Sequence, residues 1–97
     1  MKQFSVSDDE VKQLHELQAT AYLNMAICFF LLKEYQKSAE NAKKSIVFNK
    51  TIKAYYRLGM AYKQLQNYDQ AKEALLSAIK LDVSDPNDIQ TELAKVE

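Results

Sequence analysis

An internal repeat constrains this chain more than any other feature of its sequence. The stretch from Lys53 to Leu81, KAYYRLGMAYKQLQNYDQAKEALLSAIKL, matches the stretch that lies 33 residues earlier. In both copies apolar residues recur at steps of three and four, which is typical of amphipathic helices. Helical segments that repeat at such a period stack as a helix-turn-helix solenoid, so the sequence predicts this architecture.

Gly59 is the only glycine of the chain, and it lies inside the first helix of the later copy. A glycine within a helix costs about 1 kcal/mol relative to alanine. We therefore expect another backbone to approach closely at this position. Gly59 indicates a contact between helices and not a break in one.

Length and charge exclude several classes of protein. The 97 residues suffice for one domain, and the 13 basic and 13 acidic residues cancel, so no global attraction to nucleic acid or to anionic membranes is expected. Cys28 is the only cysteine, and the start has no signal-peptide pattern, which predicts a reducing, cytoplasmic location. The most apolar run, residues 19–32, is too short and too polar to span a membrane.

The order of the patterns predicts an all-α domain over residues 8–97, after a tail at 1–7 that is loosely ordered or left over from cloning. Ser7 and Glu10 have the spacing of a capping box, which predicts a long first helix from Asp8 to about Leu32. The predicted units are a first helix pair at 8–48, a second pair at 52–81, and a capping helix at 86–95 whose Ile89, Leu93 and Val96 face inward.

Small and aromatic residues recur in register in the two copies. They are Ala26 and Gly59 in the first helices, Phe29 and Tyr62 three positions later, Tyr35 and Tyr68 opening the second helices, and Ser38, Ala71 and Ala78 where helices cross. This pattern resembles the tetratricopeptide repeat (TPR) family. The resemblance implies an antiparallel helix-pair solenoid with two complete repeats and a C-terminal capping helix.

The first helix, with its run Leu-Gln-Ala-Thr-Ala-Tyr-Leu-Asn-Met-Ala, is similar to the second repeat of the large immunophilins, which are FK506-binding and cyclophilin-type peptidyl-prolyl isomerases. This similarity implies a co-chaperone module that lacks its first repeat and carries no isomerase domain itself. Some members of the family bind the C-terminal Glu-Glu-Val-Asp of the ninety- or seventy-kilodalton cytosolic heat-shock chaperones through a carboxylate clamp. Carried over, the clamp positions fall on Asn24, Lys53 and Arg57. Two further clamp residues come from the first repeat, so their loss implies weak binding.

Spacing supports such a clamp independently. Lys53 and Arg57 are four residues apart, so they share a helix face at about 6 Å between Cβ atoms. Asn24 is equivalent to Arg57 in the repeat, which predicts the same face of a neighbouring helix about 10 Å away. A guanidinium, an ammonium and an amide are suitable donors for two carboxylates. The apolar side chains expected beside them, to receive a valine, are Leu23, Ile27, Tyr56 and Met60.

Simpler interpretations stand beside this one. A basic pair on a helix is more often a solvated surface, and Lys63 is interpreted in that way. An amide buried in an apolar run without partners would cost about 1 to 3 kcal/mol, which favours a functional role for Asn24. Cys28 is predicted to be a packed, inert thiol, and His15 a surface residue.

Self-association is the rival function from another class. Leu23, Ile27, Phe30 and Leu31 form a second apolar face on the first helix, so a helical scaffold could dimerise through that face without any clamp. No catalytic constellation, phosphate-binding loop or cofactor or metal motif is found in the sequence. The aromatic residues are predicted to be core, and without a basic stripe a nucleic-acid interface is not expected.

Overall fold

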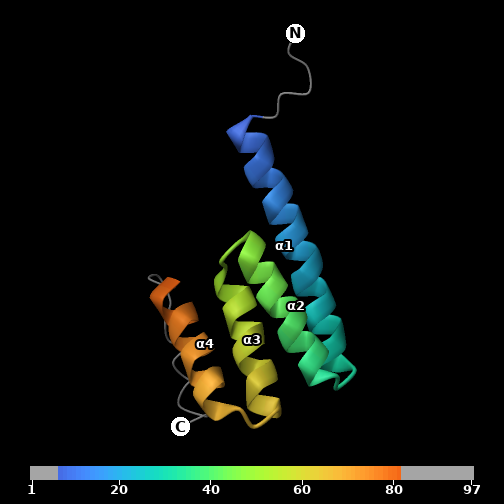
Figure 1. The fold of residues 1–97 in the computed structure, drawn as a ribbon, viewed down its shortest axis with the longest axis vertical. Helices are drawn as coiled ribbons and strands as arrows, with labels where there is room; N and C mark the ends of the chain where they lie inside the picture. Colours follow the sequence, from blue (N-terminus) through green and yellow to red (C-terminus); the bar gives the residue numbers. More distant parts are fainter. Residues whose placement is uncertain (1–6, 82–97) are drawn as a thin grey trace.

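The computed structural model describes residues 7–81, which form four antiparallel helices in a single layer (Figure 1). The helices are α1 (Asp8–Leu31), α2 (Tyr35–Phe48), α3 (Ile52–Gln64) and α4 (Tyr68–Leu81), and these residues contain no strand. Each helix packs against the next, and α1 also contacts α3. The all-α, helix-pair architecture predicted from the repeat is confirmed. The predicted capping helix at 86–95 lies outside the described residues.

The start of α1 is fixed by the predicted capping box. The Ser7 hydroxyl accepts a hydrogen bond from the Glu10 backbone N–H at 3.1 Å, and the Ser7 backbone N–H donates to the Glu10 carboxylate at 3.0 Å. The hydrogen bond from the Ser7 backbone N–H holds the pKa of Glu10 below its usual value, and the Ser7 hydroxyl adds a smaller lowering effect. Asp8 and Asp9 add negative charge at the positive end of the helix dipole.

Both helix pairs turn through the same backbone motif. Glu34 N–H donates to the Phe29 carbonyl at 2.8 Å, and the equivalent Asn67 N–H donates to the Tyr62 carbonyl at 2.9 Å. Between them, Lys33 and Gln66 adopt left-handed φ angles of 65° and 64°. This is the Schellman arrangement, in which glycine is the preferred residue at the left-handed position. The 33-residue repeat therefore extends to the turns, although neither turn contains a glycine.

Small residues let the helices pack closely. Ser38 and Ser45 of α2 are buried, and their hydroxyls donate to the Ala26 and Ala19 carbonyls of α1, each at 2.7 Å. On the other side of the layer, a Cβ placed on Gly59 would lie 2.8 Å from two side-chain atoms of Leu75 and 3.3 Å from a backbone oxygen of α4. The close approach predicted at Gly59 is confirmed, and its nearest neighbour is a side chain.

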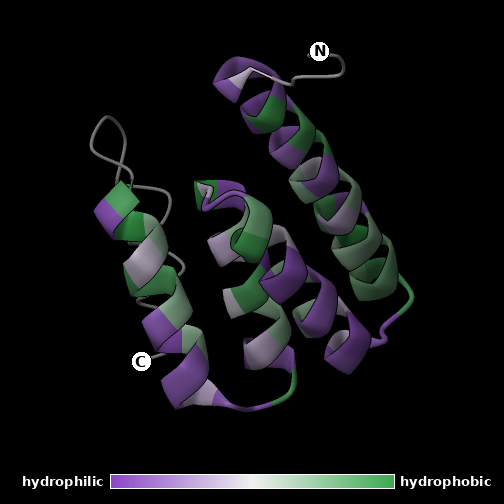
Figure 2. Cartoon of the chain, turned by 45° about the horizontal axis from the view of Figure 1, so that its top comes forward, coloured by the Kyte–Doolittle hydropathy of each residue, from purple (hydrophilic) through white to green (hydrophobic). Residues whose placement is uncertain are grey.

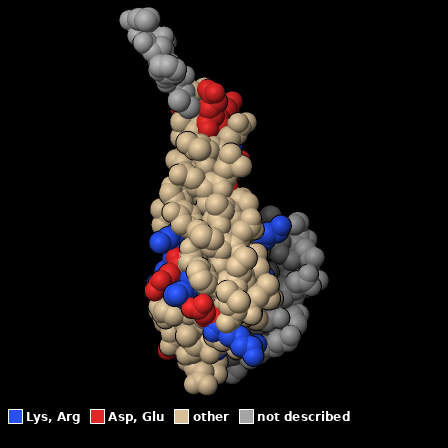
Figure 3. All heavy atoms as spheres, turned by 90° about the vertical axis from the view of Figure 1, so that its right-hand side faces the viewer, with Lys and Arg blue, Asp and Glu red and all other residues tan. Residues whose placement is uncertain are grey.

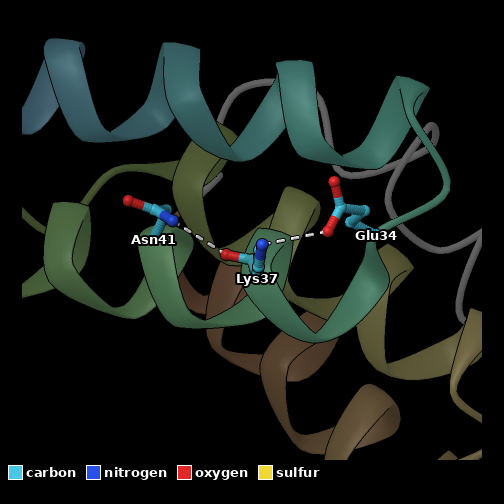
Figure 4. Close-up of polar contacts among 3 residues, drawn as sticks. All are labelled: Glu34, Lys37 and Asn41. Carbon is cyan, nitrogen blue, oxygen red and sulfur yellow. Dashed lines mark hydrogen bonds and ion pairs between the residues drawn. The ribbon is translucent and has the colours of Figure 1, made fainter.

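The outer surface of α2 is polar, in contrast to the apolar second half of α1 (Figure 2). Lys37 pairs with Glu34 at 3.1 Å, and the Asn41 side chain donates to the Lys37 carbonyl at 2.9 Å (Figure 4). The Lys37 ammonium also lies 5.6 Å from the centre of the Phe29 ring. These contacts are local to α2 and the adjoining end of α1, so they stabilise the first helix pair and involve no residue of α3 or α4.

The N-terminal part of α1 extends beyond the helices that pack against it (Figure 1). Residues 8–17 are all exposed, and farther along the helix Met25 and Cys28 are exposed as well. The prediction that Cys28 is a packed thiol was therefore wrong. Periodicity correctly indicated a helix here, but it could not show that no element among residues 7–81 covers this side of it.

Candidate functional site

The first helices of the two pairs, α1 and α3, contact each other, and the surface along this contact is here called the α1–α3 groove. The end of this groove that lies at the N-terminus of α3 contains a cavity of about 270 Å³. Its walls come from α1, from the end of α2, from the α2–α3 connection and from the first turn of α3. The lining residues are Ala19, Thr20, Leu23, Asn24, Ile27, Ser45, Asn49, Thr51 and Lys53.

Two of the predicted polar site residues therefore meet in one cavity. Asn24 comes from α1 and Lys53 from the first turn of α3, and both are exposed to solvent. Thr51 caps α3 by accepting a hydrogen bond from the Ala54 N–H at 3.1 Å. The positive end of the α3 dipole and the Lys53 ammonium thus act at the same place, and both favour an anion there.

Arg57 does not line this cavity; it lies farther along α3. Its guanidinium carbon is 5.2 Å from the centre of the Phe30 ring, which belongs to α1. Phe30 is itself held by Tyr35, with ring centres 5.2 Å apart in an edge-to-face arrangement. A guanidinium above an aromatic face keeps the N–H groups of its edge available, so Phe30 fixes the position of Arg57 without using its hydrogen-bonding capacity.

The predicted apolar residues divide in the same way. Leu23 and Ile27 are half-buried in the cavity wall, whereas Tyr56 and Met60 are half-buried on α3 and do not line it. Phe30 packs against the core, so Leu23, Ile27, Phe30 and Leu31 do not form one exposed surface. Of these four, only Leu31 is well exposed, at 74%. The proposed dimer face made of these residues is therefore divided between the groove, the core and solvent.

The argument that Asn24 needs a function because it is buried was wrong, since Asn24 is exposed. Sequence reasoning also missed Asn49 and Thr51, which the α2–α3 connection places in the cavity wall. Thr51 could have been found as a helix N-cap, because threonine directly before an apolar helical pattern is a start signal. Nothing in the sequence pattern indicates Asn49.

The charge distribution along the groove is one-sided. The α3 sequence contains Lys53, Arg57 and Lys63 and no acidic residue. The facing stretch of α1, residues 17–31, contains no charged residue at all. The acidic side chains of the described region lie in the first half of α1, at the start of and along α2, and on α4. The chain has no net charge, yet both charged residues that the described part of the chain places in the groove, Lys53 and Arg57, are positive.

A second cavity of about 270 Å³ lies between α2, α3 and α4, with Lys43, Tyr55, Gln70 and Glu73 among its lining residues. It contains both charge signs, and so it favours an acidic ligand less than the groove does. Within residues 7–81, no group of three or more His, Cys, Asp or Glu side chains could hold a metal ion. None of the helices in this part of the chain is long and apolar enough to cross a membrane.

Comparison with known proteins finds a matching family model and several relatives of this chain. Residues 52–84 match the family model described as Tetratricopeptide repeat. The chain is 36% identical over 66 residues to "Hsp70/Hsp90 co-chaperone CNS1" of Saccharomyces cerevisiae, which covers 67% of this chain and 16% of that protein. It is 33% identical over 64 residues to "FK506-binding protein 5" of Rhizopus delemar, covering 65% of this chain and 17% of that protein.

A third relative is "Peptidyl-prolyl cis-trans isomerase PASTICCINO1" of Arabidopsis thaliana, 33% identical over 82 residues, covering 84% of this chain and 13% of that protein. The matched regions span less than a fifth of each of these three relatives. The relatives named as co-chaperone, FK506-binding protein and isomerase therefore share with this chain the region of its helix pairs, and most of their length lies outside the comparison.

Proposed function

Because the chain belongs to the tetratricopeptide repeat family, we propose that its α1–α3 groove binds the acidic C-terminal tail of a heat-shock chaperone. The tail meant is Glu-Glu-Val-Asp, carried by the cytosolic ninety- or seventy-kilodalton chaperones. The observation that carries the proposal is the charge of the groove: Lys53 and Arg57 of α3 lie beside a stretch of α1, residues 17–31, that contains no charged residue. An acidic peptide with a free carboxyl end is the complementary ligand.

Each polar residue has a distinct task in this proposal. Lys53 and Asn24, which line one cavity, bind the terminal carboxylate as ammonium and amide donors. Arg57, which is steadied on the Phe30 ring, binds a side-chain carboxylate of the peptide with two parallel N–H groups. The dipole of α3 adds to the attraction at the end where the main-chain carboxylate is placed.

The apolar part of the groove is assigned to the valine of the peptide. Leu23 and Ile27 are half-buried on the cavity wall, and so they offer an apolar surface beside the polar donors. On α3, Tyr56 lies three residues after Lys53 and Met60 three residues after Arg57, and both are assigned to the peptide residues before the valine. Burying such a side chain contributes about 1.5 to 3 kcal/mol.

The comparisons support this partner without deciding it. One relative is named as a co-chaperone of Hsp70 and Hsp90, and two others carry isomerase or FK506-binding names. We infer that the chain acts as a cytoplasmic co-chaperone module of an immunophilin-like protein and is not itself an isomerase. Its task is to bring the rest of such a protein to a chaperone.

Isothermal titration calorimetry with a peptide ending in Met-Glu-Glu-Val-Asp tests the proposal. Each charge-assisted hydrogen bond contributes about 1.5 to 3 kcal/mol, so Arg57→Ala and Lys53→Ala should each weaken binding by about tenfold or more. Lys80→Ala removes the same charge from the exposed end of α4 and should leave the affinity unchanged. Equal affinities for Arg57→Ala and the Lys80→Ala control would contradict the assignment.

A further inference from the structure

An exposed apolar stripe runs along the side of α1 that faces away from α2. It consists of Leu14, Leu17, Ala21, Met25 and Cys28, all of them exposed. Leu14 and Leu17 are 55% and 68% exposed, which is unusual for leucines at helical spacing. The buried residues of α1, Ala19 and Ala26, lie on the opposite side of the helix, against α2. Figure 3 shows the corresponding side of the molecule as an uncharged column below the acidic start of α1.

The stripe is symmetric about its centre. Its residues are spaced by three, four, four and three positions, so the pattern reads the same from either end with Ala21 in the middle. An antiparallel copy of α1 centred on Ala21 therefore places Leu17 opposite Met25 and Leu14 opposite Cys28, twice each. Val11 and Leu31, the next exposed apolar residues, are also equidistant from Ala21 and lie at the flanks of the stripe, about 80° round the helix from its centre.

We propose that α1 pairs with α1 of a second copy of this chain, antiparallel and across a two-fold axis at Ala21. A dimer with two-fold symmetry requires such a self-complementary contact. When residue i of one copy contacts residue j of the other, residue j of the first copy also contacts residue i of the second. A small residue at the axis lets the two helix backbones approach, and the larger residues on either side interlock. The contact runs over residues 11–31, about 30 Å of helix.

Charge favours the same orientation. A parallel pairing would bring the three acidic residues of the first turn together, like charge against like charge.

The overhang of α1 gives the pairing a physical role. The first turns of α1 extend past the other helices (Figure 1), every residue of 8–17 is exposed, and a stretch this short gains little stability from helix propensity alone. In the proposed dimer Val11, Leu14 and Leu17 of this overhang pack on the second half of the other copy's α1, which α2 supports from behind. The contact surface differs from the α1–α3 groove, so the proposal does not depend on peptide binding.

Sedimentation equilibrium of the whole chain, without peptide, tests the state of association. From micromolar to half-millimolar concentrations the mass should rise from 11.2 kDa toward twice that value. Leu17→Glu buries a charge at the contact and should weaken association about tenfold or more, whereas Val47→Glu, at a residue 80% exposed on α2, should not change it. A monomer at every concentration would overturn the proposal and leave the stripe to a different occupant.

Engineered thiols test the orientation. At a helix separation of about 8 to 10 Å, Cα atoms that face each other at the axis are about 4 to 5 Å apart, within the range of a disulfide. Under mild oxidation Ala21→Cys combined with Cys28→Ala should give a covalent dimer. Leu14→Cys combined with Cys28→Ala should not, because the two new thiols are about 21 Å apart along the axis. Leu14→Cys with Cys28 retained should cross-link again. Equally rapid cross-linking of the two Cys28→Ala variants would contradict the antiparallel arrangement.

Discussion

Substituting Gly59 by alanine should destabilise the fold, although alanine is the better helix former. In an open helix the change gains about 1 kcal/mol in propensity. Here the new methyl group would lie 2.8 Å from both Cγ and Cδ2 of Leu75 and 3.3 Å from the Ala71 carbonyl oxygen. Leu75 is completely buried and cannot move into solvent. Overpacking of this kind costs about 1 to 3 kcal/mol, so the net loss expected is about 1 kcal/mol, or about 4 to 8 °C in Tm.

The repeat itself offers the compensating change. Ala26 and Ala42 of the first helix pair are equivalent to Gly59 and Leu75 of the second. Where the second pair combines a glycine with a leucine, the first pair therefore has two alanines. Leu75→Ala alone should cost about 2 to 5 kcal/mol because it leaves a cavity. In that background Gly59→Ala should stabilise by about 1 kcal/mol, since the clash is gone and the propensity gain remains.

Urea unfolding followed by circular dichroism gives the four free energies of this double-mutant cycle. The two substitutions should be coupled, with Gly59→Ala unfavourable beside Leu75 and favourable beside alanine. If Gly59→Ala stabilises the otherwise unchanged chain by about 1 kcal/mol, the close packing of α3 on α4 is not the reason for the glycine.

Three further changes test the local structure. Ser38→Ala removes the buried 2.7 Å hydrogen bond to the Ala26 carbonyl and should lower the free energy of unfolding by about 1 kcal/mol in a urea titration. Gln66→Gly relieves a left-handed φ of 64° and should raise that free energy by about 1 kcal/mol; an unchanged value would show that the turn is not strained. Ser7→Ala removes the Ser7 hydroxyl, whose hydrogen bond to the Glu10 carboxylate helps to lower the pKa of that group in the folded chain, so this pKa should rise when followed by NMR. Since the pKa is lowered, the contribution of the capping box to stability is present at neutral pH and is lost as the pH falls through that pKa.

The fold was predictable because local signals and the repeat agreed. The Ser7–Glu10 capping box marks the start of the first helix, and the 33-residue match places the second pair by analogy with the first. The turns at Lys33 and Gln66 were located from their polar residues, but their left-handed backbone was not predictable, because neither is a glycine or an asparagine. Periodicity thus predicted where the helices lie, whereas the left-handed backbone conformation of the turns is known only from the structure.

The candidate site was less accessible to sequence reasoning. Helical spacing places Lys53 and Arg57 on one face, but only the fold shows that Arg57 lies on the Phe30 ring while Lys53 lines the cavity. Contacts between helices that are distant in sequence decide such details. For the same reason the exposure of Asn24 and Cys28 was predicted incorrectly: a pattern of apolar residues does not tell which face another element covers.

The most direct test of the proposed groove compares a peptide ending in Glu-Glu-Val-Asp with the same peptide bearing a C-terminal amide. If Lys53 binds the terminal carboxylate, amidation should weaken binding by about tenfold or more, and this loss should largely disappear in Lys53→Ala, because the partner is already gone. An amidated peptide that binds as tightly as the free acid, or a loss of the same size in Lys53→Ala, would show that the groove does not recognise a carboxyl terminus through this residue.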